Sequence, residues 1–144
     1  MARVVTVFSR IINGELPGHF VWRDERCAAF LSHAPLKDGH TLVVPRVEVD
    51  HWLDLDPVEF AHASRVAQII GRAIQAVYSP TKVAMILAGL EVPHVHLHLI
   101  PFDAMRELSF SNAQHGTPAA RLAAEAARIR EALARQGHAA HATG

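Results

Sequence analysis

The segment from His94 to Pro101 alternates histidine with aliphatic residues, and a proline stands at each end of it. Because successive side chains of a β-strand point to opposite faces, this alternation predicts a strand with His94, His96 and His98 on one face, roughly 6.5 Å apart. The other face is aliphatic and suits a packed core. Three imidazoles buried without partners would each cost about 1 to 3 kcal/mol, so the histidine face is predicted to have a function.

Length and composition predict one domain over residues 1–137, followed by a disordered tail over residues 138–144. The chain has 144 residues, 50% of them hydrophobic, which is enough for one packed core. Its 14 basic residues balance its 14 acidic residues, so no overall field draws it to a nucleic acid polymer or an anionic membrane. We find no membrane-length apolar run and no leader sequence, and the predicted location is cytoplasmic.

The hydrophobic periodicity predicts an α+β fold, with an antiparallel sheet of about five strands covered by helices. Besides the histidine strand, strands are expected at residues 19–22, 27–31, 41–45 and 83–87, and helices at residues 8–14, 57–78 and 117–137. The first two strands are short and close together, which predicts a hairpin. Asp56 and Pro57 mark the start of the longest helix, where Glu59 is placed to complete a capping box.

The single cysteine and six of the 11 histidines show no pattern that indicates chemistry. Cys27 lies in an apolar run and has no partner for an intrachain disulfide, so it is predicted to be a small buried hydrophobic residue. Surface or loop positions are expected for the six histidines, which are His19, His33, His62, His115, His138 and His141.

Two kinds of chemistry fit the histidine face. In the first, a pair such as His94 and His96 binds the metal ion of a metal-dependent hydrolase. All three histidines together span about 13 Å along a straight strand, which is too far for one zinc ion. In the second, the central imidazole attacks phosphorus while its neighbours hydrogen-bond the phosphate oxygens. The spacing favours the second chemistry, because it gives each of the three residues a role.

Two further blocks accompany the pattern His-x-His-x-His-x-x-Pro, in which each x is apolar. One is Gly-His-Thr-Leu-Val-Val-Pro-Arg at residues 39–46, and the other is Ile-Ile-Asn-Gly-Glu-Leu-Pro at residues 11–17. With these three blocks in this order, the sequence resembles the histidine triad (HIT) superfamily over residues 8–102, nearest its Hint-type branch. The resemblance implies a homodimeric α+β fold. It also implies an enzyme that cleaves at the α-phosphorus of a nucleotide, as nucleoside phosphoramidases, dinucleoside polyphosphate hydrolases and nucleotidyl transferases do.

The resemblance assigns a role to each histidine of the site. His96 is the expected nucleophile, which forms a nucleotidyl-histidine intermediate that water then cleaves. His98 is expected to bind a phosphate oxygen. His94 and His40 are expected beside His96, where they fix its tautomer and its orientation. The implied ligand is a nucleotide or a nucleotide-derived small molecule, and no cofactor is implied.

The substrate-binding loops depart from the family pattern. Ser32 stands where family members usually have an aspartate that holds the ribose. Leu90 stands where glutamine is expected, and Glu91 where serine or threonine is common; with Gly89 and His98, these are the predicted substrate-binding residues. Glu91 is either a functional group, as a general acid or a selector of a cationic leaving group, or a solvated loop carboxylate. The departures also leave open a nucleotide-binding module with weak or lost catalysis.

Many family members hold a structural zinc ion through an N-terminal Cys-x-x-Cys motif and two histidines. The aligned positions here are Thr6 and Ser9, although His51 matches one of the histidines. Because the two cysteines are replaced, the sequence predicts no metal ion at this site.

Overall fold

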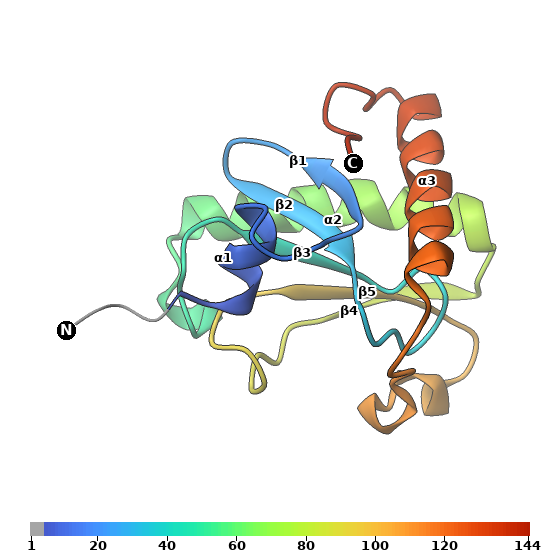
Figure 1. Cartoon of the computed structure of the whole chain (residues 1–144), viewed down its shortest axis with the longest axis horizontal. Coiled ribbons are helices and arrows are strands. Elements are labelled where there is room, and N and C mark those ends of the chain that lie inside the picture. The colour runs from blue at the N-terminus through green and yellow to red at the C-terminus, as the bar shows by residue number, and fades with distance from the viewer. Residues whose placement is uncertain (1–4) are drawn as a thin grey trace.

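The computed structural model describes residues 5–144, which form one antiparallel sheet with helices on both of its faces (Figure 1). In chain order the elements are α1 (Val7–Ile12), β1 (Phe20–Arg23), β2 (Cys27–Leu31), β3 (Thr41–Pro45), η1 (Trp52–Asp54), α2 (Pro57–Tyr78), β4 (Lys82–Ile86), β5 (Leu97–Phe102), η2 (Met105–Leu108), η3 (Phe110–Asn112) and α3 (Ala119–Arg135), where η marks a short 3₁₀ helix. The strand order is β1-β2-β3-β5-β4. The predicted α+β fold with about five antiparallel strands is confirmed.

The alternation of side chains along the strands divides the core between the two faces of the sheet. On one face, α2 and α3 pack against a cluster that includes Val43. On the other face, α1 places Phe8 against Phe30. Figure 1 shows α1 in front of the sheet and α2 behind it. His98 stands opposite Leu42 in the pairing of β5 with β3, so it lies on the face that α1 covers.

The longest helix, α2, begins and ends where the sequence predicts. The Asp56 side chain accepts a hydrogen bond from the amide of Val58 (2.8 Å), which satisfies one of the free amides of the first turn. Glu59 does not complete the predicted capping box. It accepts a hydrogen bond from the guanidinium of Arg26 (2.9 Å) and so ties α2 to the turn between β1 and β2. None of the described helices combines the length and the apolar character needed to cross a membrane.

The strand expected from the apolar run at residues 83–87 is β4, and it lies at the edge of the sheet beside β5. Its side chains are only partly buried, and Met85 is 57% exposed. An apolar strand of this kind is usually covered on both faces, so its partial exposure at an edge leaves an apolar surface open on this chain.

The hydrogen-bonded ladder of β5 begins at Leu97, whereas the alternation of the histidine segment predicts a strand from His94 onward. The amide of Val95 donates to the carbonyl of Val49 (2.8 Å), a residue that lies beyond the end of β3. The prediction of one straight strand is therefore wrong for His94 and His96. Contacts of their own, rather than the pleat of a sheet, set the positions of these two rings.

The C-terminal residues fold back onto β1, which corrects the prediction of a disordered tail. Gly137, with a φ of +93°, follows the end of α3 and turns the chain. The amide of Arg23 donates to the carbonyl of His141 (3.0 Å). The rings of His138 and His141 lie 5.8 and 5.0 Å from that of Trp22. Figure 1 shows the C-terminus beside β1, a neighbour far away in the sequence.

Candidate active site

A cavity of about 190 Å³ lies on the α1 side of the sheet, and five of the residues that line it are histidines. His40 is the residue before β3, His98 lies in β5, and His96 is the residue before β5. Residues of α1, of the loop after β2 and of η3 close the other sides of the cavity. Apart from His40, His96 and His98, the lining residues are Val7, Phe8, Ile11, Ser32, His33, Ala34, Leu42, Glu91, Val92, Phe110, Ala113 and His115. The fold therefore brings the two histidine-containing blocks of the sequence into one site.

His96 has the geometry of a nucleophile. The residue is 4% exposed, and its Nδ1 lies 2.7 Å from the backbone carbonyl oxygen of His94. A carbonyl oxygen can only accept, so Nδ1 donates and Nε2 carries the lone pair of the neutral ring. Burial lowers the pKa of His96. The hydrogen bond to His94 and the charge of Glu91 raise this pKa, but by less. The neutral ring with an unprotonated Nε2 is the form that attacks an electrophile.

A chain of hydrogen bonds fixes the tautomers of His40 and His98. The amide of Leu36 donates to His40 Nδ1 (3.0 Å), so the proton of the neutral His40 ring lies on Nε2. His40 Nε2 lies 2.9 Å from His98 Nδ1 and therefore donates to it. The proton of the neutral His98 ring then lies on its own Nε2. This gives His98 a donor for a phosphate oxygen.

Burial keeps these two imidazoles neutral. It lowers the pKa of His40 from 6.5 to about 3, and the neighbouring rings of His98 and His96 add to the shift. Burial also lowers the pKa of His98 to about 4, with His96 again as the neighbour. The assigned tautomers therefore persist at neutral pH. As the pH falls from 6.5 toward about 4, the unfolded chain takes up protons that the folded chain does not, so the fold loses stability.

The ring of His94 is fully buried and is not among the groups that line the cavity. Its Nε2 donates to the carbonyl of Pro45 (2.7 Å), so its Nδ1 accepts from the hydroxyl of Thr6 (2.7 Å). The sequence analysis expects the rings of His94 and His40 to fix the tautomer of His96. In the structure, the backbone carbonyl of His94 contacts His96, and His40 bonds the ring of His98.

The structure brings some of the predicted substrate-binding residues to the cavity and leaves others outside it. Ser32, Glu91 and His98 line the cavity, whereas Gly89 and Leu90 are not among its lining residues. Leu90 is 97% exposed. The Ser32 hydroxyl accepts a hydrogen bond from the amide two residues later (3.3 Å), which leaves its proton to donate to a ligand. The polar side chain that the segment 87–93 offers to the cavity is therefore Glu91.

The sequence analysis did not identify several of the residues that form the site. The ring of Phe8 in α1 lies 4.8 Å from that of His96, and the ring of Phe110 in η3 lies 5.0 Å from that of His98. Leu36 contributes only its backbone amide to the chain of hydrogen bonds. An aromatic residue in a helix or loop predicts ordinary packing, and a backbone donor leaves no side-chain pattern, so the sequence carries no signal for these roles.

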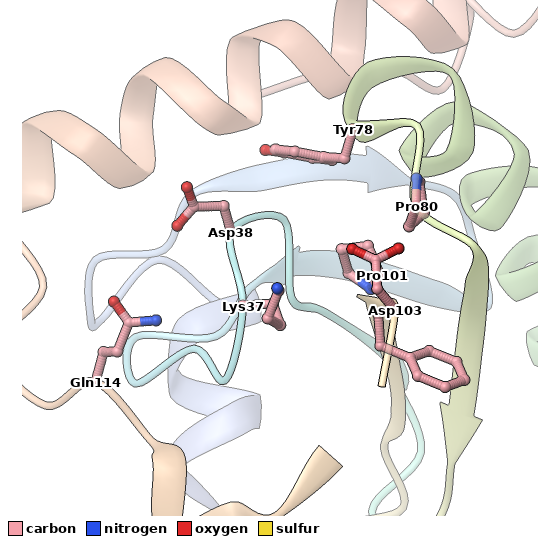
Figure 2. Close-up of a pocket in the computed structure, with 8 residues that line it drawn as sticks. Lys37, Asp38, Tyr78, Pro80, Pro101, Asp103 and Gln114 are labelled. Carbon is pink, nitrogen blue, oxygen red and sulfur yellow. The ribbon is translucent and has the colours of Figure 1, made fainter. Parts of the chain in front are cut away.

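A larger cavity, of about 390 Å³, lies near the C-terminal end of β5; Figure 2 shows Asp38 and Tyr78 on its wall. Asp38 forms an ion pair with Arg121 of α3, and the hydroxyl of Tyr78 donates to Glu125 of the same helix (2.9 Å). These bonds fasten the loop before His40 and the end of α2 to α3. The polar groups of this cavity therefore support the loop that carries His40.

The residues at the position of the family's zinc site do not fit zinc. Thr6 and Ser9 offer hydroxyl groups in place of thiolates. Thr6 Oγ1 accepts from the amide of Ser9 (3.1 Å) as the N-cap of α1, and it also bonds His94 Nδ1. The third candidate ligand, His51, accepts from the amide of Leu53 (3.4 Å) at the start of η1. The Thr6 hydroxyl therefore bonds His94 at this position.

Comparison with known proteins identifies the family. The sequence model of the HIT domain matches residues 13–105, a range that contains His40, His96 and His98. The chain belongs to the HIT family. The membership predicted from the three sequence blocks is thus confirmed.

The relatives of this HIT protein include nucleotide hydrolases. An uncharacterised HIT-like protein of Borreliella burgdorferi is 35% identical over 102 residues, which are 66% of this chain and 73% of the relative. An adenylylsulfatase of Arabidopsis thaliana is 31% identical over 100 residues, which are 66% of this chain and 51% of the relative. A bis(5′-nucleosyl)-tetraphosphatase (asymmetrical) of Schizosaccharomyces pombe is 36% identical over 85 residues, which are 56% and 47% of the two chains.

A solved structure shares the fold of this HIT protein. It is that of a zinc-bound histidine triad family protein from Mycobacterium smegmatis, which is 27% identical and superimposes with a TM-score of 0.79. The match covers 92% of this chain and 96% of that chain. It confirms the HIT-like α+β architecture predicted from the sequence.

Proposed function

We propose that this HIT protein cleaves nucleotide phosphates at the α-phosphorus through a covalent intermediate on His96. The proposal rests on the hydrogen bond from His96 Nδ1 to the carbonyl of His94, which leaves Nε2 unprotonated. The hydrolases among the relatives support a nucleotide substrate. Nucleoside phosphoramidates and dinucleoside polyphosphates are the substrate classes to assay, and loss of their turnover in His96→Asn is the test.

Two displacements at phosphorus make up the proposed reaction. In the first, His96 Nε2 forms a bond to the α-phosphorus, and the leaving amine or phosphate departs with the electron pair of its own bond and takes up a proton. In the second, water attacks the phosphorus and gives up a proton to solvent, and the bond from phosphorus to Nε2 breaks, which releases the nucleotide and restores the Nε2 lone pair of His96. His98 Nε2 donates to a non-bridging oxygen, whose negative charge grows in each transition state. The bond from His40 holds this donor in place.

We propose that Glu91 favours a cationic leaving group. Glu91 lines the cavity, and its carboxylate is close enough to His96 to raise the pKa of that ring in part. A positively charged amine on the leaving side of phosphorus would meet this carboxylate. Ser32, on the loop after β2, is the proposed contact for the nucleotide.

Substitution Glu91→Gln should narrow the preference for a cationic over a neutral amine leaving group. Glu91 is exposed, so the expected change in the ratio of the two kcat/KM values is about 2- to 5-fold, the size of a solvent-screened charge pair. Steady-state kinetics with two phosphoramidates that differ only in the charge of the amine measure it. An equal loss for both substrates would instead assign general acid catalysis to Glu91, and no change would leave it a solvated carboxylate.

A binding module with weak or lost catalysis is the second candidate function. One observation favours it: Leu90, which stands where a glutamine is expected, points into solvent and supplies no hydrogen bond to a substrate. Calorimetry with AMP and GMP separates the two functions, because tight binding without turnover of any phosphoramidate supports the module.

The third alternative, a metal-dependent hydrolase that uses His94 and His96 as ligands, is not supported by their hydrogen bonds. Both ring nitrogens of His94 have hydrogen-bond partners, and Nδ1 of His96 donates to a carbonyl. Only His96 Nε2 of these four nitrogens is left to bind a metal ion. The absence of a cofactor and the cytoplasmic location stay predictions.

We also propose that the protein forms a homodimer through β4 and the adjoining face of α2. Within the described residues, β4 pairs only with β5, so its other edge can accept a strand. A groove of about 660 Å³ between these elements is lined by Met85 and Ser64, and the Ser64 hydroxyl is buried without a partner among the described residues.

Light scattering should give twice the 15.8 kDa of one chain, and Met85→Lys should shift the mass toward one chain. A single-chain mass for the unmodified protein would contradict this.

A further inference from the structure

Three potential metal ligands converge on the face of the sheet opposite the histidine cavity. Asp24 lies in the turn after β1, Cys27 opens β2, and His62 projects from the first turns of α2. One ligand atom of each lies within 4.8 Å of the other two. Asp24 Oδ2 is 2.7 Å from His62 Nε2 and 3.5 Å from Cys27 Sγ. Cys27 belongs to the core under α2 and α3, so this cluster is separate from the proposed active site.

The Asp24 carboxylate is held rigidly in place. Its Oδ1 accepts hydrogen bonds from the amides of Arg26 (2.7 Å) and Cys27 (2.8 Å), and its Oδ2 accepts from the indole of Trp22 (2.8 Å). Burial alone would raise the pKa of Asp24, but these bonds and the one from His62 together hold it well below its usual range. Carboxylates that bind metal ions are commonly held in this way, ionised and with hydrogen bonds to the second oxygen.

The surroundings of Cys27 disfavour a thiolate, whereas a bound cation would favour it. Cys27 is 1% exposed, and burial together with the Asp24 carboxylate raises its pKa. Its sulfur already lies 3.5 Å from Asp24 Oδ2, toward which the thiol donates. A bound divalent cation deprotonates a ligating thiol, so the Asp24 carboxylate and the Cys27 thiolate would then share one cation.

The cluster is open on one side. Asp24 and His62 line a cavity of about 490 Å³, whose wall also includes His138 and His141 of the folded-back C-terminal segment. This cavity gives a cation a way in and leaves space for a water molecule or a further ligand. The tail that the sequence predicted as disordered therefore forms part of the wall of the site.

We propose that Asp24 Oδ2, Cys27 Sγ and His62 Nε2 bind a zinc ion, with water in the fourth position. A mixed oxygen, sulfur and nitrogen set suits zinc and excludes magnesium and calcium, which take oxygen ligands. Ligand atoms around a tetrahedral zinc ion are separated by about 3.3 to 3.6 Å. Asp24 Oδ2 and His62 Nε2 would have to move apart by a fraction of an ångström, and the 3.5 Å between Asp24 Oδ2 and Cys27 Sγ already fits. The thiol and the His62 ring lie within 4.8 Å and would have to move to zinc-ligand separation.

Cobalt(II), a spectroscopic substitute for zinc, tests the site in the untagged full chain. Because the chain has a single cysteine, any thiolate-to-cobalt charge-transfer band reports Cys27. We expect this band at one cobalt per chain, and we expect zinc to remove it. The band should be absent in Cys27→Ser, and His62→Gln should weaken cobalt binding by about tenfold or more.

Two matched controls separate this proposal from the proposed function. His19→Gln removes a histidine outside the cluster, and His96→Asn removes the proposed nucleophile, and both should keep the band at full affinity. His62 is partly exposed, so His62→Gln is expected to fold. The absence of a charge-transfer band in the unmodified protein, or full affinity in His62→Gln, would overturn the zinc site whatever the turnover of the protein.

Discussion

Replacing His96 with asparagine should lower nucleotide turnover by about 10⁴-fold or more, the usual scale for loss of a nucleophile. Asparagine keeps a polar group near the carbonyl of His94 but has no nitrogen lone pair that can attack phosphorus. Steady-state hydrolysis of an AMP phosphoramidate and of a diadenosine polyphosphate measures the effect.

The matched control for His96→Asn is His19→Asn, a histidine outside the cavity, which should keep full turnover. Circular dichroism and AMP binding by calorimetry show whether His96→Asn keeps its fold and its ligand. Unchanged turnover in a folded His96→Asn protein would remove covalent catalysis by this residue.

Replacing His40 with alanine should cost both stability and turnover. The residue is 2% exposed, and it accepts from the amide of Leu36 and donates to His98. The substitution leaves a cavity and a buried amide without its partner, for an expected loss of about 2 to 4 kcal/mol in the free energy of unfolding. Turnover should fall by about 10²-fold, because nothing then fixes the proton of His98 on Nε2. Urea unfolding and steady-state kinetics measure the two effects.

Substitution His19→Ala provides the control for stability, since it truncates a half-buried histidine outside this chain of hydrogen bonds. Its cost should stay below about 1 kcal/mol. If His40→Ala were as stable as His19→Ala and kept its turnover, the hydrogen-bond chain from Leu36 to His98 would have no role.

Local patterns in the sequence were enough to predict most of the architecture. Asp56 and Pro57 placed the start of α2, because a helix cap and an N1 proline act within one turn of the chain. The alternation around His98 gave the correct face of β5, because side-chain direction follows from the pleat alone. His40, His96 and His98 line one cavity because β3 and β5 pair side by side.

The parts that the sequence could not predict depend on contacts between distant residues. The ring of His94 bonds Thr6 and Pro45, so its position follows from tertiary contacts and not from the strand period. Leu36 acts through a backbone amide, which every residue except proline has. His62 shows no motif in the sequence because its partner, Asp24, lies in another element. In each case the missing information was which element packs against which.

The stereochemical course at phosphorus tests covalent catalysis most directly. The substrate is a single diastereomer of an adenosine phosphoramidate with sulfur in place of one non-bridging oxygen, hydrolysed in isotopically labelled water. Attack by His96 followed by attack by water inverts the phosphorus twice, so we predict net retention of configuration. Net inversion would show a single attack by water and would contradict the nucleotidyl-histidine intermediate.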